Sequence, residues 1–190
     1  MKTNFTKPLA LAGAIAGLAF LPACSSGETE EGVEESQDYT TLTMAAALSD
    51  LPEMASLNGA ISSAQLNSIF DGPASYTVLA PVDEAFTALG EQGQSLMTEE
   101  QRPVLAGVLR EHILPGHLTP EDIMGAIESQ DGEVTMTTFA GGDLTFSMDG
   151  ETVIATNPTG EVARFTGGAT QANNGVIIPV DAVMVPGDEG

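Results

Sequence analysis

Residues 76–86, YTVLAPVDEAF, change from an almost continuous apolar run to a helical pattern at a single proline. The run Tyr76–Ala80 is short and rich in residues that favour β-structure, so we expect a strand that ends before Pro81. Residues 82–89, VDEAFTAL, place three apolar side chains on one helical face: Ala85, Phe86 and Leu89. Two acidic residues occupy the first turn, where the helix dipole favours negative charge: Asp83 and Glu84. The stretch therefore predicts a strand followed directly by a short helix.

The chain before this stretch has the apolar spacing of helices. Residues 42–51 and 54–70 carry Leu, Met, Ile and Ala at mixed spacings of three and four positions. Pro52 and the pair Asn58-Gly59 interrupt this pattern, because proline and glycine are unfavourable inside helices. We therefore expect two or three short helices before the strand.

Two helix starts follow the stretch. The segment 98–101, TEEQ, has the residues of a capping box, although Pro103 places the first regular turn of that helix near Glu100. Thr119 has the side chain of an N-cap, and Pro120 suits the first position of the helix after it. The sequence thus predicts two further helices, one after each of these starts.

The rest of the chain changes to the alternating pattern of β-strands after Asp131-Gly132. Apolar and polar residues alternate in three segments: 134–138, 144–148 and 153–155. Hairpin turns are expected at the glycine-containing pairs between them: Gly141-Gly142 and Asp149-Gly150. The last run, residues 175–185, is nearly continuous Val, Ile and Met, and we expect a central strand buried on both faces. Helices first and strands later predict an α+β domain.

The N-terminus has the three-part layout of a secretory signal peptide. Lys2 and Lys7 precede the apolar run 9–21, and the single cysteine of the chain, Cys24, follows shortly after it. The run is short for a membrane span, which takes about 20 residues, so we expect its removal. Leu-Pro-Ala before Cys24 resembles the lipobox of bacterial lipoproteins, which implies cleavage of residues 1–23 and diacylation of the Cys24 thiol. Ordinary secretion with an unpaired thiol is the alternative.

Residues 24–38 connect this cysteine to the first apolar run. Small and acidic residues dominate the segment 25–38, SSGETEEGVEESQD, which predicts an extended, self-repelling tether. A metal-binding acidic tract is the alternative, but nothing in the segment fixes the geometry of ligands. We expect the folded domain to occupy residues 39–187 and a short tail to occupy residues 188–190.

The composition is strongly acidic, with 5 Lys and Arg residues against 27 Asp and Glu residues. Loss of residues 1–23 removes Lys2 and Lys7 and leaves a mature charge of about −24. Binding to nucleic acid needs basic residues that displace counterions, so the sequence excludes nucleic acid as a partner. Cell envelopes and most extracellular polysaccharides are also anionic, so attachment to them is expected to strengthen with NaCl, and further with Ca²⁺.

Three segments resemble the motifs of the fasciclin (FAS1) domain. Residues 76–86 resemble its first signature, and Asn174–Pro186, NGVIIPVDAVMVP, resembles the second. Between them, Leu109–Ile123, LREHILPGHLTPEDI, is similar to the segment that holds a Tyr-His pair in the family. The resemblance implies a wedge of two β-sheets decorated by several short helices, in an extracellular or surface-anchored protein associated with adhesion. The residues that match the family motifs are Thr77, Ala80, Pro81, Ala85, Phe86, His112, Pro115, Gly116, Asn174, Gly175, Asp181 and Pro186.

The chain departs from the family pattern at three motif positions: Val82 replaces a threonine, Glu111 replaces the tyrosine and Ile178 replaces a histidine. Pro179 is also unusual, because a proline in a central strand removes a hydrogen-bond donor and normally marks a bulge or a free edge. In animal members, integrin recognition is associated with the Tyr-His segment and with an Asp-Ile pair. This chain has Ala169-Thr170 where that pair stands, so the resemblance does not imply integrin binding.

Few residues suggest catalysis or metal binding. His112 and His117 could hold a metal with a nearby carboxylate, but a buried core histidine and a surface histidine are the simpler interpretation. The chain has no G-x-S-x-G motif and no Gly-rich phosphate loop after a strand. The Asp-Gly-Glu segments 131–133 and 149–151 lack the alternating oxygen ligands of an EF-hand and are expected to be turns. We therefore expect no catalytic residue, metal ligand or cofactor.

The sequence thus predicts an exported protein of the cell envelope, on the outer membrane or on a periplasmic or extracellular face, anchored through lipid on Cys24. Its fasciclin-type domain is expected to mediate adhesion or contact with a surface or matrix, whose partner is a protein or polysaccharide. The alternative is a periplasmic enzyme or small-ligand receptor with a pocket around His112. A deep cavity with converging polar groups would favour the alternative, and a filled core would favour adhesion.

Overall fold

The computed structural model describes residues 39–185, so Cys24, the expected signal peptide and tether, Pro186 and the expected tail lie outside the described residues. The helices are η1 Tyr39–Thr41, α1 Met44–Asp50, η2 Pro52–Met54, α2 Ala55–Ser63, α3 Asn67–Phe70, α4 Asp83–Ala88, α5 Glu91–Leu96, α6 Arg102–Glu111 and α7 Pro120–Ser129. The strands are β1 Tyr76–Pro81, β2 Ile113–Pro115, β3 Glu133–Thr137, β4 Asp143–Asp149, β5 Thr152–Thr156, β6 Val162–Arg164, β7 Thr170–Ala172 and β8 Gly175–Val180. Within this range no helix has the length and apolar character that a membrane span requires.

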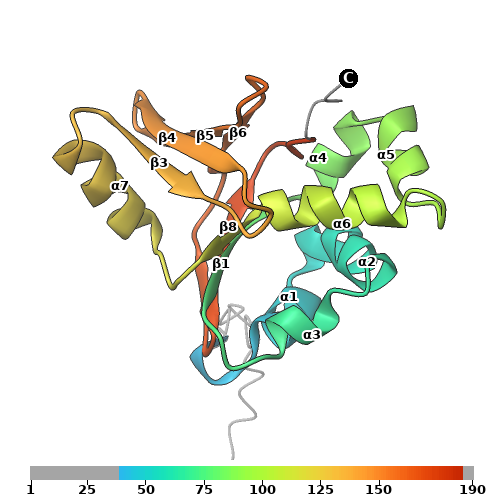
Figure 1. Cartoon of the computed structure of the whole chain (residues 1–190). Coiled ribbons are helices and arrows are strands. Elements are labelled where there is room, and N and C mark those ends of the chain that lie inside the picture. Colours follow the sequence, from blue (N-terminus) through green and yellow to red (C-terminus); the bar gives the residue numbers. More distant parts are fainter. Residues whose placement is uncertain (1–38, 186–190) are drawn as a thin grey trace, which may run out of the picture. The chain divides into compact units, whose positions relative to one another are not determined.

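Two four-stranded sheets form the centre of the domain. The first has the strand order β2-β1-β8-β7, and the second has the order β3-β4-β5-β6. In the first sheet β1 and β8 run parallel, in register from Tyr76 with Gly175 to Pro81 with Val180. The second sheet is an antiparallel meander. The expected α+β architecture of two sheets decorated by short helices is confirmed (Figure 1), and the two signature stretches pair at the centre of the first sheet.

The first sheet lies between two hydrophobic clusters, which explains why β1 and β8 are apolar on both faces. Val78 and Ile177 belong to a cluster with side chains of α1, α2, α3 and α6. Leu79 and Ile178 belong to the other cluster, with side chains of β4, β5 and α7. The expected central position and two-sided burial of the last strand are thus confirmed, although β8 ends at Val180 rather than continuing to residue 185.

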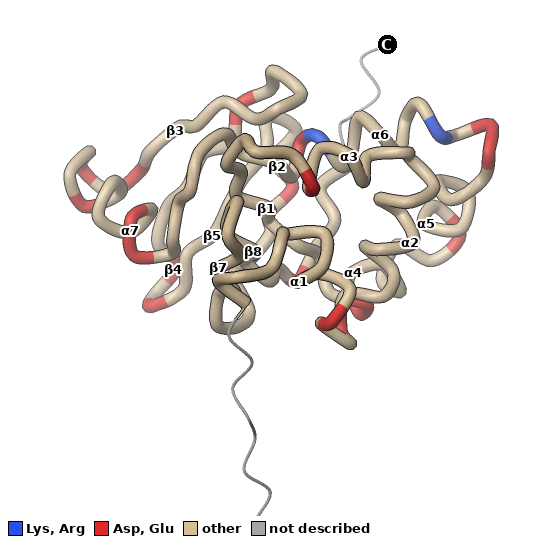
Figure 2. Tube along the Cα trace, turned by 90° about the horizontal axis from the view of Figure 1, so that it is seen from below, with Lys and Arg blue, Asp and Glu red and all other residues tan. Residues whose placement is uncertain are grey.

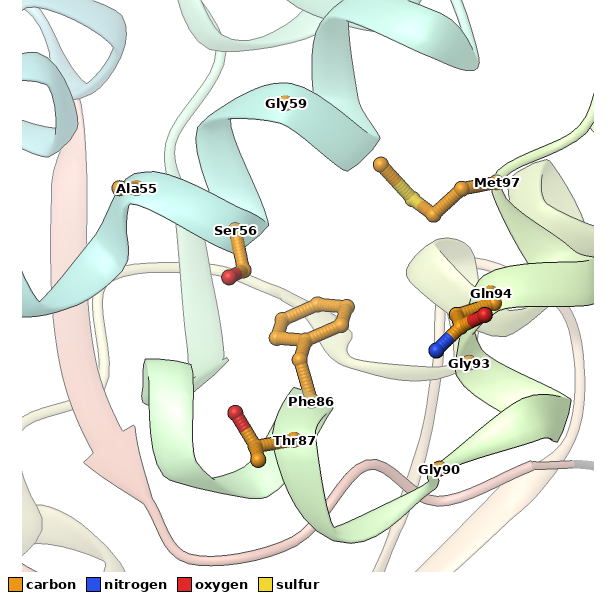
Figure 3. Close-up of a pocket in the computed structure, with 9 residues that line it drawn as sticks. All are labelled: Ala55, Ser56, Gly59, Phe86, Thr87, Gly90, Gly93, Gln94 and Met97. Atoms are coloured by element: carbon orange, nitrogen blue, oxygen red, sulfur yellow. The ribbon is translucent and has the colours of Figure 1, made fainter.

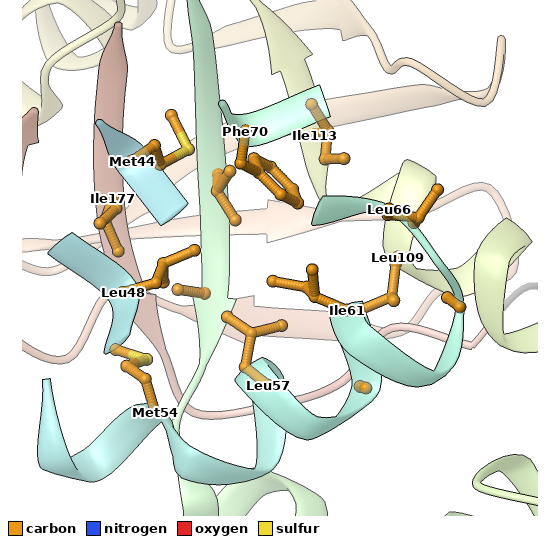
Figure 4. Close-up of a cluster of buried hydrophobic side chains, with 14 of the residues drawn as sticks. Met44, Leu48, Met54, Leu57, Ile61, Leu66, Phe70, Leu109, Ile113 and Ile177 are labelled. Atoms are coloured by element: carbon orange, nitrogen blue, oxygen red, sulfur yellow. The ribbon is translucent and has the colours of Figure 1, made fainter. Parts of the chain in front are cut away.

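The cluster between the helices and the first sheet joins segments that are far apart in the chain (Figure 4). Met44 and Leu48 of α1 are almost fully buried, as are Leu57 and Ile61 of α2. They pack with Ile177 of β8 and with side chains of α3 and α6. The short helices of the N-terminal half therefore depend on tertiary packing for their stability, because isolated helices of this length are unstable in water.

Prolines in β1 and β8 lie beyond the ends of the neighbouring outer strands β2 and β7. β2 pairs only with Tyr76–Val78, so Pro81 lies beyond the end of β2. β7 pairs only with Gly175–Ile177, so Pro179 lies beyond the end of β7, and its carbonyl accepts a hydrogen bond from the Thr166 N–H at 3.0 Å. The missing donors break no ladder, and Pro179 stays in register with β1 without a bulge. The prediction that the first strand ends before Pro81 is therefore wrong by one residue.

Helix α2 runs through Asn58-Gly59, where the sequence predicted an interruption. Asn58 Nδ2 donates a hydrogen bond to the Leu48 carbonyl at 2.6 Å and ties α2 to the end of α1. A Cβ on Gly59 would lie 3.8 Å from Met97 Cε, so the glycine faces the segment that follows α5. Gly59 leaves space between these elements without breaking the helix.

The two predicted helix starts have different outcomes. The capping box at Thr98 does not form, and α6 begins at Arg102. A helix that began at Thr98 would carry Pro103 in its interior, whereas a start at Arg102 places this proline in the first turn, where its missing donor has no cost. Thr119 caps α7 as expected and forms a capping box with Asp122. The neighbouring hydrogen bonds with Thr119 lower the pKa of the Asp122 carboxyl.

Candidate functional site

The second signature places Asn174 at the centre of three hydrogen bonds. Its Oδ1 accepts from the Met44 N–H at 2.7 Å, and its Nδ2 donates to the carbonyls of Phe70 and Gly72 at 2.7 and 2.9 Å. The adjacent Gly175 packs so closely against β1 that a Cβ there would clash with the Tyr76 carbonyl oxygen. Both residues are buried, so these motif positions hold distant segments together rather than contact a partner.

Thr77 of the first signature connects β1 to the Tyr-His segment. Its hydroxyl donates to the Gly116 carbonyl at 2.9 Å and accepts from the Leu118 N–H at 2.8 Å. Pro115 pairs with Tyr76 at the end of β2, and Gly116 has a φ of +99°, which residues with a Cβ rarely adopt. This group of motif residues therefore fixes the turn after β2.

His112 is buried and uses both ring nitrogens inside the fold. Its Nδ1 lies 2.8 Å from the Val108 carbonyl, and its Nε2 lies 3.0 Å from the Met184 N–H. A carbonyl only accepts and a backbone N–H only donates, so the neutral ring carries its proton on Nδ1. Burial lowers the pKa of His112 to about 4, and the hydrogen bond to Val108 opposes this effect. The residue therefore ties α6 to the chain after β8 as a neutral side chain.

The surroundings of His112 do not form the pocket that the receptor or enzyme alternative requires. The cavity beside it has a volume of about 10 Å³, and apolar side chains form most of its walls. Such a space holds about one water molecule and no substrate. His117 is exposed, and the described residues contain no group of three or more His, Cys, Asp or Glu side chains that could hold a metal. The core around His112 is filled.

The other motif residues in the described range also pack inside the domain or tie its segments together. Ala80 and Ala85 are buried, and Asp181 accepts a hydrogen bond from the Arg164 N–H at 2.7 Å. Phe86 is half-buried and packs against the clusters beneath α4. These motif residues do not form a shared surface site, and of them only Phe86 lines a surface groove.

Two of the positions that depart from the family pattern lie beside defined local contacts. Val82 stands at the N-cap of α4 without a side-chain hydrogen bond. The next residue, Asp83, joins α4 to α2, because its Oδ1 accepts a hydrogen bond from the Ser56 N–H at 2.7 Å. Glu111, in place of tyrosine, accepts a hydrogen bond from the Thr138 hydroxyl at 3.3 Å. Neither contact creates an open polar site.

A groove of about 610 Å³ lies between α2 and the segment of α4 and α5. Small residues line the α2 side: Ala55, Ser56 and Gly59. The ring of Phe86 projects into the space between these residues and Met97 (Figure 3). No residue that lines the groove carries a charge.

Glycines shape this groove from both sides. Gly59 leaves α2 without a side chain opposite Met97. Gly93 lies so near α4 that a Cβ would be 3.1 Å from the Phe86 carbonyl oxygen, and this close approach brings α5 against α4. Gly90 turns the chain between the two helices with a φ of +56°. The sequence analysis missed the groove, because it took Gly59 as a helix interruption and expected no helix around Gly93.

Comparisons with known proteins agree on the fold. Residues 52–186 match the family model of the fasciclin domain. Over 181 residues the chain is 29% identical to Protein sll1483 from Synechocystis sp. (strain ATCC 27184 / PCC 6803 / Kazusa), with 93% of each chain covered. The solved structure of a FAS1 domain pair from the insect cell adhesion molecule fasciclin I superposes with a TM-score of 0.67 and 16% identity, over 78% of this chain and 51% of that chain.

The chain therefore spans about half the length of that domain pair, and at 16% identity the likeness shows the fold alone. The family model, by contrast, covers well over half of the chain, including all three of the motif segments that the sequence suggested. On this match the chain belongs to the fasciclin (FAS1) domain family.

Proposed function

We propose that this protein is a lipid-anchored protein of the cell envelope whose fasciclin domain mediates adhesion to a surface or matrix. Fasciclin domains are linked to adhesion in general and are generally non-enzymatic. The observation that carries the proposal is the internal use of the polar motif side chains. Asn174, Thr77 and His112 all bind backbone groups of the fold, and no buried side-chain polar atom in residues 39–185 lacks a partner. We therefore infer that a partner contacts the outer surface of the domain and not these motif side chains.

The outer surface of the described domain is acidic. Figure 2 shows Asp and Glu positions at many separate places along the fold and far fewer Lys or Arg positions. The basic residues of this range are Arg102, Arg110 and Arg164, and Arg164 lies in an ion pair with Asp149 at 2.6 Å. Anchoring through Cys24 would hold this acidic module near the membrane, with residues 25–38 as the tether. The proposed partner is a protein or polysaccharide surface of the envelope or matrix.

Attachment of cells tests this function directly. Cells of the source organism that lack the protein should attach less to a matrix-coated surface than wild-type cells, and the full-length protein should restore attachment. A Cys24→Ala protein that still folds should restore attachment poorly, because it is no longer held at the membrane. Equal attachment with and without the protein would contradict the adhesive role, and full rescue by Cys24→Ala would contradict the need for an anchor.

A further inference from the structure

The groove between α2 and α4–α5 is open to solvent and has a mostly apolar lining. Phe86 lies within it, and Met97, which is 39% exposed, forms part of its wall. Methionine is flexible and polarisable, so an exposed Met adapts to apolar groups of different shape. The volume of about 610 Å³ lies in the range of roughly 300–1,000 Å³ that is typical of ligand pockets. The groove has room for a large apolar side chain of a partner.

Acidic residues neighbour the groove-lining residues in the first turns of α4 and α5. The Asp83 carboxylate accepts a hydrogen bond from the backbone N–H of the groove residue Ser56, and the exposed Glu84 follows Asp83 in the first turn of α4. Glu91 begins α5 and follows Gly90, which lines the groove. Figure 2 shows acidic positions beside α4 and at α5. These carboxylates give the rim a negative potential, which attracts cationic groups and repels anionic ones.

The nearest basic residue along the chain after the groove is already paired. The Arg102 guanidinium lies 3.6 Å from the Glu99 carboxylate, three positions earlier. No lysine occurs among the described residues, so the rim has little positive charge of its own. The negative charge of the rim is therefore available to pair with basic residues of a partner.

This charge disfavours three other occupants. A second copy would bring another strongly acidic domain against an acidic rim. The C-terminal residues 186–190, PGDEG, carry two acidic residues and no large apolar side chain. An anionic polysaccharide would meet the same repulsion and would leave the apolar lining unfilled.

We propose that this groove docks a basic segment of a partner protein. An apolar side chain of that segment packs between Phe86, Met97 and the small residues of α2, while flanking Lys or Arg residues pair with the carboxylates at the rim. This interaction goes beyond the proposed adhesion to anionic surfaces, because its partner has the opposite charge. Apolar anchors of this kind supply affinity, and charges at the rim supply orientation and a faster association rate.

The glycines of the domain allow a sharp test. Gly59→Leu would fill the groove, because a Cβ at this position meets only Met97 Cε at 3.8 Å and the helical backbone of α2 tolerates the change. Gly125 of α7 is the matched control, since a Cβ there has no atom within 4 Å and α7 does not line the groove. Both changes replace glycine with a better helix former, so both variants should be at least as stable as the wild type. Met97→Ser provides a second groove variant that adds no bulk.

The probes are three capped peptides, KKLFKK, KKSSKK and EELFEE, titrated into the full-length chain by calorimetry. KKLFKK should bind wild type and Gly125→Leu with the same affinity, with a dissociation constant below about 1 mM. Gly59→Leu and Met97→Ser should each bind it about tenfold more weakly, because burial of the apolar anchor is lost. KKSSKK and EELFEE should also bind about tenfold more weakly, because KKSSKK lacks the apolar anchor and EELFEE lacks the basic flanking residues.

Several results would overturn the proposal. Absence of KKLFKK binding, or equal binding by Gly59→Leu, would show that the groove does not dock such a segment. Equal binding of KKSSKK would reduce the interaction to charge alone, and equal binding of EELFEE would remove the charge selection. A dimer in sedimentation that Gly59→Leu dissociates would identify a second copy as the occupant. Peptide binding is independent of Cys24 and of cell attachment, so its failure and the failure of the adhesive role are separately visible.

Discussion

The side chain of Asn174 accepts a hydrogen bond from the backbone N–H of Met44, 130 positions earlier, at 2.7 Å. Met44 is the first residue of α1, where backbone N–H groups have no partner within the helix. Asn174 therefore supplies a buried cap for a helix that the family model, which begins at residue 52, does not include. The motif residue and the N-terminal helix form one structural unit.

Substitution of Asn174 with alanine should therefore destabilise the domain strongly. The change would leave the Met44 N–H and the carbonyls of Phe70 and Gly72 without their partner in a buried site. We expect a loss of about 3 kcal/mol in the free energy of unfolding, measured with urea. Asn173→Ala is the matched control, because the Asn173 side chain makes one long, exposed hydrogen bond of 3.4 Å, and it should cost less than about 1 kcal/mol. Equal losses for the two variants would contradict the capping role.

Protonation of His112 should destabilise the domain in mild acid. The folded state lowers the pKa of His112 to about 4, whereas an unfolded chain protonates it near its ordinary value of 6.5. The unfolded state therefore binds the extra proton first as the pH falls from 6.5 to 4, and stability is lost across this window at about 1.4 kcal/mol per pH unit. Above pH 6.5 both states are neutral and the effect vanishes.

Urea unfolding at pH 7 and pH 5 measures this effect. From pH 7 to pH 5 the free energy of unfolding of the wild type should fall by about 2 kcal/mol more than that of His112→Gln, which has no imidazole to protonate. His117→Gln is the control, because His117 is exposed, and it should keep the wild-type dependence on pH. If the stability of His112→Gln depended on pH as that of the wild type does, other groups would be the cause of this dependence.

Much of the fold could be predicted because its central elements have strong patterns. β1 and β8 are apolar on both faces, and β3, β4 and β5 alternate between turns that contain glycine. The strands that the sequence analysis missed are β2, β6 and β7, each of three residues, which is too short to show alternation. Their positions follow from pairing with distant strands, which no local pattern records.

The candidate sites also differ in how far the sequence predicts them. The burial of His112 and the exposure of His117 could be predicted from the apolar face of the preceding helix and from the turn around Pro115. The groove could not be predicted, because α5 has the sequence EQGQSL and lacks an apolar helical pattern. Its walls also come from α2 and from Met97, which lie far apart in the chain. Such a surface exists only after tertiary packing.

Truncation should locate the start of the folded domain. A chain that begins at Tyr39 should melt within about 2 °C of one that begins at Ser25, if the acidic segment does not pack on the domain. A chain that begins at Pro52 should lose its cooperative transition, because it lacks the buried Met44 and Leu48, each worth about 2–5 kcal/mol. Calorimetry of the three chains compares these cases. A loss of several degrees on removal of residues 25–38 would contradict the interpretation of this segment as a tether.

Lipidation should depend on the thiol of Cys24. Cells that express the full-length protein should incorporate labelled palmitate into it, and Cys24→Ala should abolish both the label and the processing of the precursor. Cys24→Ser is a closer control in shape, and it should fail in the same way, because the acyl group is carried through sulfur. Equal labelling of wild type and Cys24→Ala would contradict the lipoprotein prediction.

The dependence of attachment on salt should reveal the charge of the surface to which the domain adheres. With a mature charge of about −24, contact with anionic cells or matrix is opposed by repulsion whose range falls as the Debye length shortens, from about 30 Å at 0.01 M salt to about 8 Å at 0.15 M. Attachment of the full-length protein to cells should therefore strengthen with NaCl, and further with Ca²⁺ at matched ionic strength, since Ca²⁺ bridges carboxylates. Binding of the basic peptide KKLFKK should weaken with NaCl in parallel titrations, because salt screens attraction between opposite charges. Cell attachment that instead falls steadily with NaCl would contradict an anionic surface. If such attachment were lost in Gly59→Leu but kept in Gly125→Leu, it would be assigned to the groove.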